Sequence, residues 1–180
     1  MKKLLVITVG LIVLAASPAF SDWRVDLGVD LAFAAGAFAG GESEIGGFEG
    51  KVLPIPIGEV SYLFDVGPLG IGVGIRGIPL IVIIPFWPDV FAELDLRKVA
   101  LEAHIGGLVF GYIGLANGVE TGKVLIPEVS GWLKLGEKDR FRLGGGVAGA
   151  WVPDADIGDD NTGISAWLFF AGCKWVIGPG

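Results

Sequence analysis

The chain alternates apolar and polar side chains with a period of two, starting soon after an apolar N-terminal run. From Trp23 to Phe33 every odd position is apolar, whereas the even positions include Arg24, Asp26 and Asp30. A helix would scatter these charges around its circumference, but a strand places all the apolar side chains on one face. This stretch therefore predicts a β-strand with one apolar face and one charged face.

The same alternation returns along the rest of the sequence. It is clearest at 69–76 and 99–106, where Leu, Ile, Val and Ala alternate with Gly, Ala or charged residues. Such runs are typical of half-buried strands. The complete pattern predicts eight strands, at residues 22–34, 51–64, 69–77, 89–96, 99–111, 123–135, 140–151 and 164–177.

The connections between these segments alternate in length. Three are of hairpin length and rich in turn-forming residues, at 65–68, 97–98 and 136–139. In an up-and-down order every second connection lies at the same end, so one end should carry the short turns and both termini. The opposite end should carry the longer loops, at residues 35–50, 78–88, 112–122 and 152–163.

The first 21 residues have the features of a signal peptide. Lys2 and Lys3 precede an apolar run from Leu4 to Ala16, and Ser21 follows as a small residue suited to a cleavage site. An uncleaved membrane anchor is the alternative, but the run is short for a spanning helix. We therefore expect residues 1–21 to be removed and residues 22–180 to form a single β-barrel domain.

This layout resembles the small bacterial outer-membrane β-barrels and is similar to that of the OmpX and OmpA transmembrane barrels. The resemblance extends over residues 22–180 and rests on the arrangement of segments, not on a unique motif. These barrels commonly end in an aromatic residue, whereas this chain ends Ile177-Gly178-Pro179-Gly180. The resemblance implies an all-β, eight-stranded antiparallel up-and-down transmembrane β-barrel in the outer membrane of a Gram-negative-type envelope.

Periodicity does not say whether the apolar face looks outward to lipid or inward. A soluble periplasmic ligand-binding barrel would turn it inward, and a membrane barrel turns it outward. The chain has 31 glycines, and many of them, such as Gly72, Gly106 and Gly144, lie on the face opposite the bulky apolar side chains. Small residues suit a narrow interior, so we expect the apolar face to contact lipid.

Aromatic residues support the same orientation, because membrane barrels carry aromatic girdles at both interfaces. One girdle is expected near the short turns and one near the long loops. The first would contain Trp23, Tyr62, Phe64, Phe141 and Trp175, and the second Phe33, Trp151 and Trp167.

The inward face should carry charged side chains of both signs. An eight-stranded barrel is just wide enough for side chains to fill it, so these groups should pair with one another in a polar network. We take this network as the candidate binding site, although a narrow path for solutes would need the same face. Its members are Arg24, Asp26, Asp30, Glu59, Arg76, Glu93, Glu102, His104, Glu128, Lys134, Arg140, Arg142 and Lys174.

Composition and motifs disfavour several other functions. The chain has 13 Lys and Arg against 20 Asp and Glu, and an acidic protein is poorly suited to bind nucleic acid. The sequence His104-Ile105-Gly106 lacks the serine of the His-x-Ser pattern that membrane lipid A deacylases resemble, so we expect no enzyme. The acidic run 154–160 fits no EF-hand loop. We therefore expect no metal and no cofactor.

These observations predict an integral outer-membrane protein with a structural, protective or interaction role. Its partners would be membrane lipid and an external molecule at the long loops, and we expect it to be a monomer. A narrow channel or transporter for small or hydrophobic solutes is the alternative, with the apolar segment 78–88 at its mouth. A soluble periplasmic barrel is the third possibility.

Overall fold

The computed structural model describes residues 21–39, 42–80, 83–114, 118–136, 138–152 and 164–178. Residues 1–20, which hold most of the predicted signal peptide, lie outside these ranges, so the signal peptide stays a prediction. Within the described ranges no helix has the length and apolar character needed to cross a membrane. The strands are β1 (Ser21–Ala39), β2 (Glu42–Gly47), β3 (Leu53–Val66), β4 (Leu69–Gly77), β5 (Ile83–Leu96), β6 (Val99–Gly114), β7 (Gly118–Leu135), β8 (Phe141–Val152) and β9 (Ile164–Ile177).

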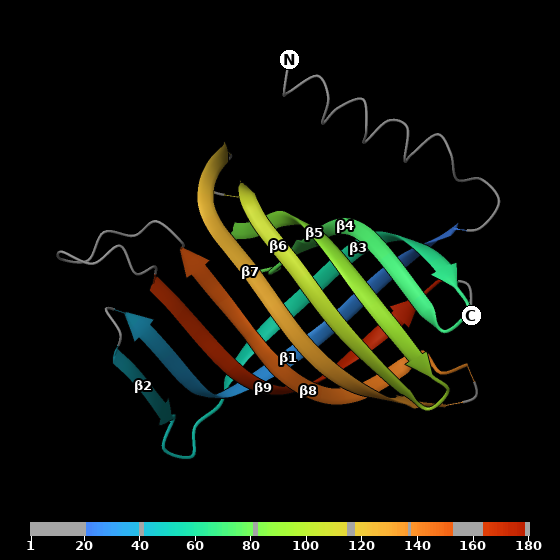
Figure 1. Ribbon diagram of the computed structural model, residues 1–180, viewed down its shortest axis with the longest axis horizontal. Coiled ribbons are helices and arrows are strands. Elements are labelled where there is room, and N and C mark those ends of the chain that lie inside the picture. The colour runs from blue at the N-terminus through green and yellow to red at the C-terminus, as the bar shows by residue number, and fades with distance from the viewer. Residues whose placement is uncertain are drawn as a thin grey trace.

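Eight of these strands close into a barrel (Figure 1). From β3 to β9 each strand pairs with the next, and β1 pairs with both β3 and β9, antiparallel throughout. In the closing pair Val25 lies opposite Ile177, and Phe38 lies opposite Ser165. The predicted eight-stranded antiparallel up-and-down barrel is therefore confirmed.

The short connections lie together at one end, on the right in Figure 1. Val66 pairs with Leu69, and Leu96 pairs with Val99, so each of these hairpins turns through two residues. Gly67 has a φ of 65° in the first turn, a backbone conformation that glycine adopts without steric cost. These two predicted turns are confirmed, whereas the third, at 136–139, includes residue 137, which lies outside the described residues. Ser21 and Gly178 lie at this same end, which we call the turn end.

At the opposite end the structure corrects the predicted loops. Much of 35–50 and 112–122, and residues 83–88, are strand, and β2 pairs back onto the end of β1. The alternating pattern is weaker there because few of these side chains are buried, but the backbone groups still pair with a neighbouring strand. Val152 belongs to β8, and the rest of the fourth predicted loop lies outside the described residues.

The barrel carries apolar residues outside and charged residues inside. Trp23 and Leu27 are 63% and 52% exposed, whereas Arg24 and Asp26 are only 5% and 6% exposed. A soluble barrel requires the reverse, so the outward direction of the apolar face is confirmed. Further exposed apolar side chains from all around the barrel are Val60, Ile71, Ile75, Val90, Leu101, Ile105, Val129, Leu133 and Leu143.

Candidate functional site

The turn end of the barrel opens into a hollow of about 740 Å³. Side chains of both signs line it, among them Asp65, Lys138 and Arg140. Lys98 and Asp139 join two turns at its edge, with 2.8 Å between Lys98 Nζ and Asp139 Oδ1. This hydrogen bond from Lys98 holds the pKa of Asp139 below its ordinary value.

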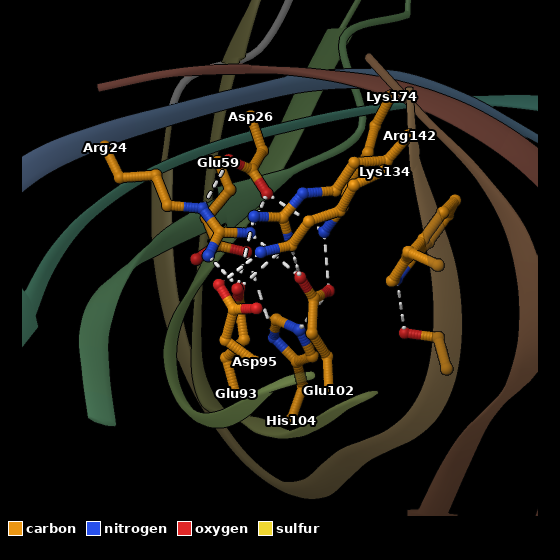
Figure 2. A network of polar contacts seen from close by, with 12 residues as sticks. Arg24, Asp26, Glu59, Glu93, Asp95, Glu102, His104, Lys134, Arg142 and Lys174 are labelled. Carbon is orange, nitrogen blue, oxygen red and sulfur yellow. Dashed lines mark hydrogen bonds and ion pairs between the residues drawn. The ribbon is translucent and has the colours of Figure 1, made fainter. Parts of the chain in front are cut away.

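Next to this hollow, strands β1, β5, β6, β7, β8 and β9 contribute charged side chains that meet inside the barrel (Figure 2). We call this set the turn-end network. It contains four carboxylates and four cations, namely Asp26, Glu93, Asp95, Glu102, Arg24, Lys134, Arg142 and Lys174.

Glu102 is the centre of the turn-end network. Its carboxylate accepts hydrogen bonds from Arg24 at 2.9 Å, Arg142 at 2.8 Å and Lys174 at 2.5 Å. Arg24 also donates to both oxygens of Asp26, at 2.7 and 2.6 Å, and to Glu93. Such charge-assisted hydrogen bonds offset the cost of removing these groups from water. Opposite charges are thus matched within this network.

A second group of charges lies deeper, near the middle of the strands. This mid-barrel cluster contains Asp30, Glu59, Arg76, Asp89, His104 and Glu128, all buried. Arg76 binds Glu128 at 2.6 Å, and His104 Nδ1 lies 2.7 Å from Asp89 Oδ2 and 3.8 Å from Glu59 Oε2. Asp30 makes no hydrogen bond or ion pair with the residues that the structure describes. Carboxylates therefore outnumber cations in this cluster.

Phe91 lies between the two sets of charges. Its ring stacks on the His104 ring at 4.8 Å and lies 5.3 Å from the guanidinium carbon of Arg24. It fits there because β4 presents Gly72 opposite it, where an added Cβ would come within 2.2 Å of the ring. Phe91 thus fills the interior at the point where the two sets meet.

Further aromatic side chains fill the interior beside the charges. Trp132 and Phe170 pack together, and Lys174 lies 4.7 Å from the centre of the Trp132 ring. Trp87 lies over Gly106, where an added Cβ would come within 2.4 Å of the indole. The described part of the interior therefore combines ion pairs with large aromatic rings that pack against glycines on the neighbouring strand.

The structure brings most of the predicted site residues together, with one exception. Arg140 is half-buried and lines the hollow at the turn end, without joining either set of charges. Whether these residues bind a ligand stays a prediction. The other predicted residues divide between the two sets: Arg24, Asp26, Glu93, Glu102, Lys134, Arg142 and Lys174 in the turn-end network, and Asp30, Glu59, Arg76, His104 and Glu128 in the mid-barrel cluster.

Asp89 and the buried aromatic residues were not among the predicted site residues. Asp89 and Phe91 occupy odd positions on the same strand as Glu93, and Trp132 occupies an even position like Lys134. Alternate positions share a face, so the period-two pattern could have placed these residues inside. It also could not show which groups His104 would meet. His104 contacts Asp89 and Glu102, whereas the hydroxyl of Ser130 accepts a hydrogen bond from Trp132 Nε1 at 2.9 Å.

The exterior decides what surrounds the barrel. Near the turn end Trp23 packs edge-on against Tyr62 at 5.2 Å, and Phe141 lies 6.1 Å from Trp175. From these rings toward the middle of the barrel, the exposed side chains of the barrel strands are apolar. Lipid is the solvent that such a surface requires. The chain forms a transmembrane β-barrel.

Comparisons with solved structures find other small barrels at low sequence identity. Neisserial surface protein A is 12% identical, with 85% of this chain and 96% of that chain covered and a TM-score of 0.44. The N-terminal β-barrel domain of Pseudomonas aeruginosa OprF is 6% identical, with 87% and 97% covered and a TM-score of 0.41. The attachment invasion locus protein Ail of Yersinia pestis is 10% identical, with 87% and 100% covered and a TM-score of 0.35.

No protein-family model matches this chain, and no curated protein matches it. The membrane assignment therefore rests on the apolar exterior and charged interior of the barrel itself.

Proposed function

We propose that this chain is an integral outer-membrane protein with a closed lumen, which acts through the end of the barrel opposite the turns. The observation that carries the proposal is the reversed polarity of the barrel, with apolar residues outside and paired charges inside. The predicted signal peptide adds a route across the inner membrane. An outer membrane is where bacterial spanning barrels reside.

The turn-end network supports a closed lumen. Arg24, Glu102 and Arg142 link three different strands across the interior, and Phe91 fills the space beside them. The hollow lined by Glu59, His104 and other members of the mid-barrel cluster measures only about 20 Å³, enough for about one water molecule. These contacts disfavour the alternative of a channel, and the proposal includes no enzymatic step.

The extended strands support a role in interaction. β2 adds a short strand to β1 beyond the barrel wall, with Ile45 and Phe38 exposed on it and beside it. The far ends of β6 and β7 also extend at this end of the barrel, and such extensions are what a structural, protective or interaction protein would present.

Leu27→Arg tests the membrane assignment. Leu27 faces outward near the middle of β1, so an arginine there should reduce stability in lipid vesicles by about 2–4 kcal/mol. Urea titration of the refolded protein measures this change. Val66→Arg is the matched control, because Val66 is exposed beside a turn and should lose about 1 kcal/mol or less. Equal effects at both positions would exclude a lipid-facing exterior.

Conductance in planar bilayers tests the closed lumen. The wild-type barrel should give no stable single-channel current, because the turn-end network crosses the interior. Glu102→Ala should produce flickering openings, whereas Lys98→Ala, at an exposed turn, should not. A steady current through the wild-type protein would favour the transporter instead.

A further inference from the structure

The mid-barrel cluster is short of positive charge. Asp30, Glu59, Asp89 and Glu128 share it with Arg76 and His104, and Arg76 is bound to Glu128 at 2.6 Å. Glu59 and Asp89 make their close contacts with the imidazole of His104 instead. We propose that Glu59, Asp89 and His104 bind one divalent transition-metal ion inside the barrel.

The three side chains have the geometry of a small metal site. One ligand atom from each lies within 4.8 Å of the other two, and the three residues are 5%, 2% and 4% exposed. They come from β3, β5 and β6, so closure of the barrel brings them together. One imidazole nitrogen and two carboxylate oxygens suit zinc, manganese or iron, and the remaining position would hold water.

The surroundings of His104 fit a metal ligand. When Nδ1 binds the ion, Nε2 carries the proton and faces Glu102 Oε2 at 3.5 Å. A carboxylate in this position commonly orients a metal-bound histidine. Glu102 of the turn-end network thus orients the His104 ring, while Glu59 and Asp89 of the mid-barrel cluster supply the other ligands.

An unpaired donor beside the cluster is a second, independent sign of a ligand. Trp87 is 6% exposed, and its Nε1 has no hydrogen-bond partner among the described residues. A Cβ added to Gly106 would lie 2.6 Å from this Nε1 and 2.8 Å from Asp89 Oδ1, so donor and carboxylate are close neighbours. A buried N–H needs an acceptor, and the oxygen of a metal-bound water provides one.

Binding also balances charge and protons. A metal ion requires the neutral imidazole, so any proton on His104 Nδ1 passes to solvent when the ion binds. Two positive charges then replace at most one in a cluster that lacks them. The adjoining hollow of about 20 Å³ is lined by Glu59 and His104 and leaves room for a water molecule.

Zinc content after refolding tests this site. The chain without its signal peptide and without a polyhistidine tag is refolded into detergent micelles with Zn²⁺, and free metal is removed by gel filtration. Mass spectrometry should find about one zinc per wild-type barrel. His104→Gln and Glu59→Gln should each retain at least about tenfold less, because each removes a ligand.

Asp95→Asn is the matched control, because Asp95 belongs to the turn-end network and lies outside the site. It should retain zinc like the wild type. Heat-dependent gel mobility identifies folded barrels, and only variants that fold are compared. If one of His104→Gln and Glu59→Gln does not fold, the other is enough for the test. Wild-type protein without retained zinc would overturn the proposal. Equal zinc in His104→Gln, Glu59→Gln and Asp95→Asn would also overturn it, because the metal would then lie elsewhere.

Discussion

The two sets of charges inside this barrel differ in how well they are matched. In the turn-end network four carboxylates face four cations, and Glu102 alone accepts hydrogen bonds from three of them. In the mid-barrel cluster Asp30 makes no hydrogen bond or close ion pair among the described residues, and Glu59 lies 3.8 Å from His104 Nδ1. Apart from the half-buried Asp95 and Lys174, both sets are buried, so burial alone does not distinguish them. The difference predicts that removing a charge from the first set costs stability, whereas removing a carboxylate from the second set costs little.

Removing the centre of the turn-end network should have the largest effect. Glu102→Gln leaves Arg24, Arg142 and Lys174 with too few carboxylates in a buried site, so we expect a loss of about 3–5 kcal/mol. Urea unfolding in lipid vesicles, followed by tryptophan fluorescence, measures the change.

Glu59→Gln is the matched substitution in the mid-barrel cluster. With a chelator present it should cost less than about 1 kcal/mol, because it removes one charge from a cluster with excess carboxylates. If Glu59→Gln and Glu102→Gln cost the same, the contrast between the two sets is wrong.

Gly72→Leu tests the boundary between the two sets. The new side chain would meet the ring of Phe91, which contacts both His104 and Arg24, so overpacking should cost roughly 1–3 kcal/mol. The same urea titration measures it. Gly58→Leu is the control, because a Cβ at Gly58 meets only Leu27 at 3.8 Å, an ordinary contact. A neutral Gly72→Leu would show that Phe91 can move away freely.

Asp30→Asn should have a smaller effect, of the opposite sign. The amide keeps the shape of the carboxylate and removes an unmatched buried charge, so stability should stay level or rise by up to about 1 kcal/mol. Urea midpoints at neutral pH, compared with those of Asp26→Asn, measure the difference. Asp26→Asn should destabilise, because Asp26 binds Arg24 and Lys174. Destabilisation by both variants would mean that Asp30 is matched after all.

The smallest effect is expected at the exposed pair of Lys98 and Asp139. Lys98→Ala removes the hydrogen bond that lowers the pKa of Asp139, so this pKa should rise toward its ordinary value. The contribution of the pair to stability is present above the ordinary pKa and is lost as pH falls through the lowered one. Carboxyl carbon NMR shifts follow the titration, with Lys51→Ala as the control. An unchanged pKa in Lys98→Ala would assign the shift to another cause.

The period-two pattern predicted the faces of the barrel well, for a physical reason. Lipid outside and a narrow interior impose opposite demands on neighbouring residues, so Leu27 and Asp26 can be assigned from the sequence alone. The far ends of β1, β6 and β7 were missed because few of their side chains are buried, so the alternation is weak there. These ends pair through backbone hydrogen bonds, which any residue type except proline can donate, so the sequence shows little sign of them.

The sequence could not predict which charges would meet. Arg24 binds Glu93, 69 residues away, and Arg142 binds the same carboxylate. These contacts depend on the tilt of the strands, which sets the level that each inward residue reaches across the barrel. Asp89 illustrates the point, because its parity was available while its contact with His104 was not. The odd or even position of a residue along its strand determines whether its side chain points inward, and the stagger of the closed sheet determines which inward side chains it meets.

The pairing of β1 with β9 also has a consequence for the order of folding. From β3 to β9 each pair joins consecutive strands, and β1 and β3 are separated only by the short β2, but the pair of β1 and β9 joins the two ends of the barrel sequence and has no turn to set its register. Gly28 lies opposite Lys174, where an added Cβ would come within 2.8 Å of the lysine Cβ. A slip of two residues would bring Asp26 or Asp30 to this crowded position. Steric fit at a glycine therefore favours one register when the sheet closes, which is a non-local pairing of the kind that forms slowly.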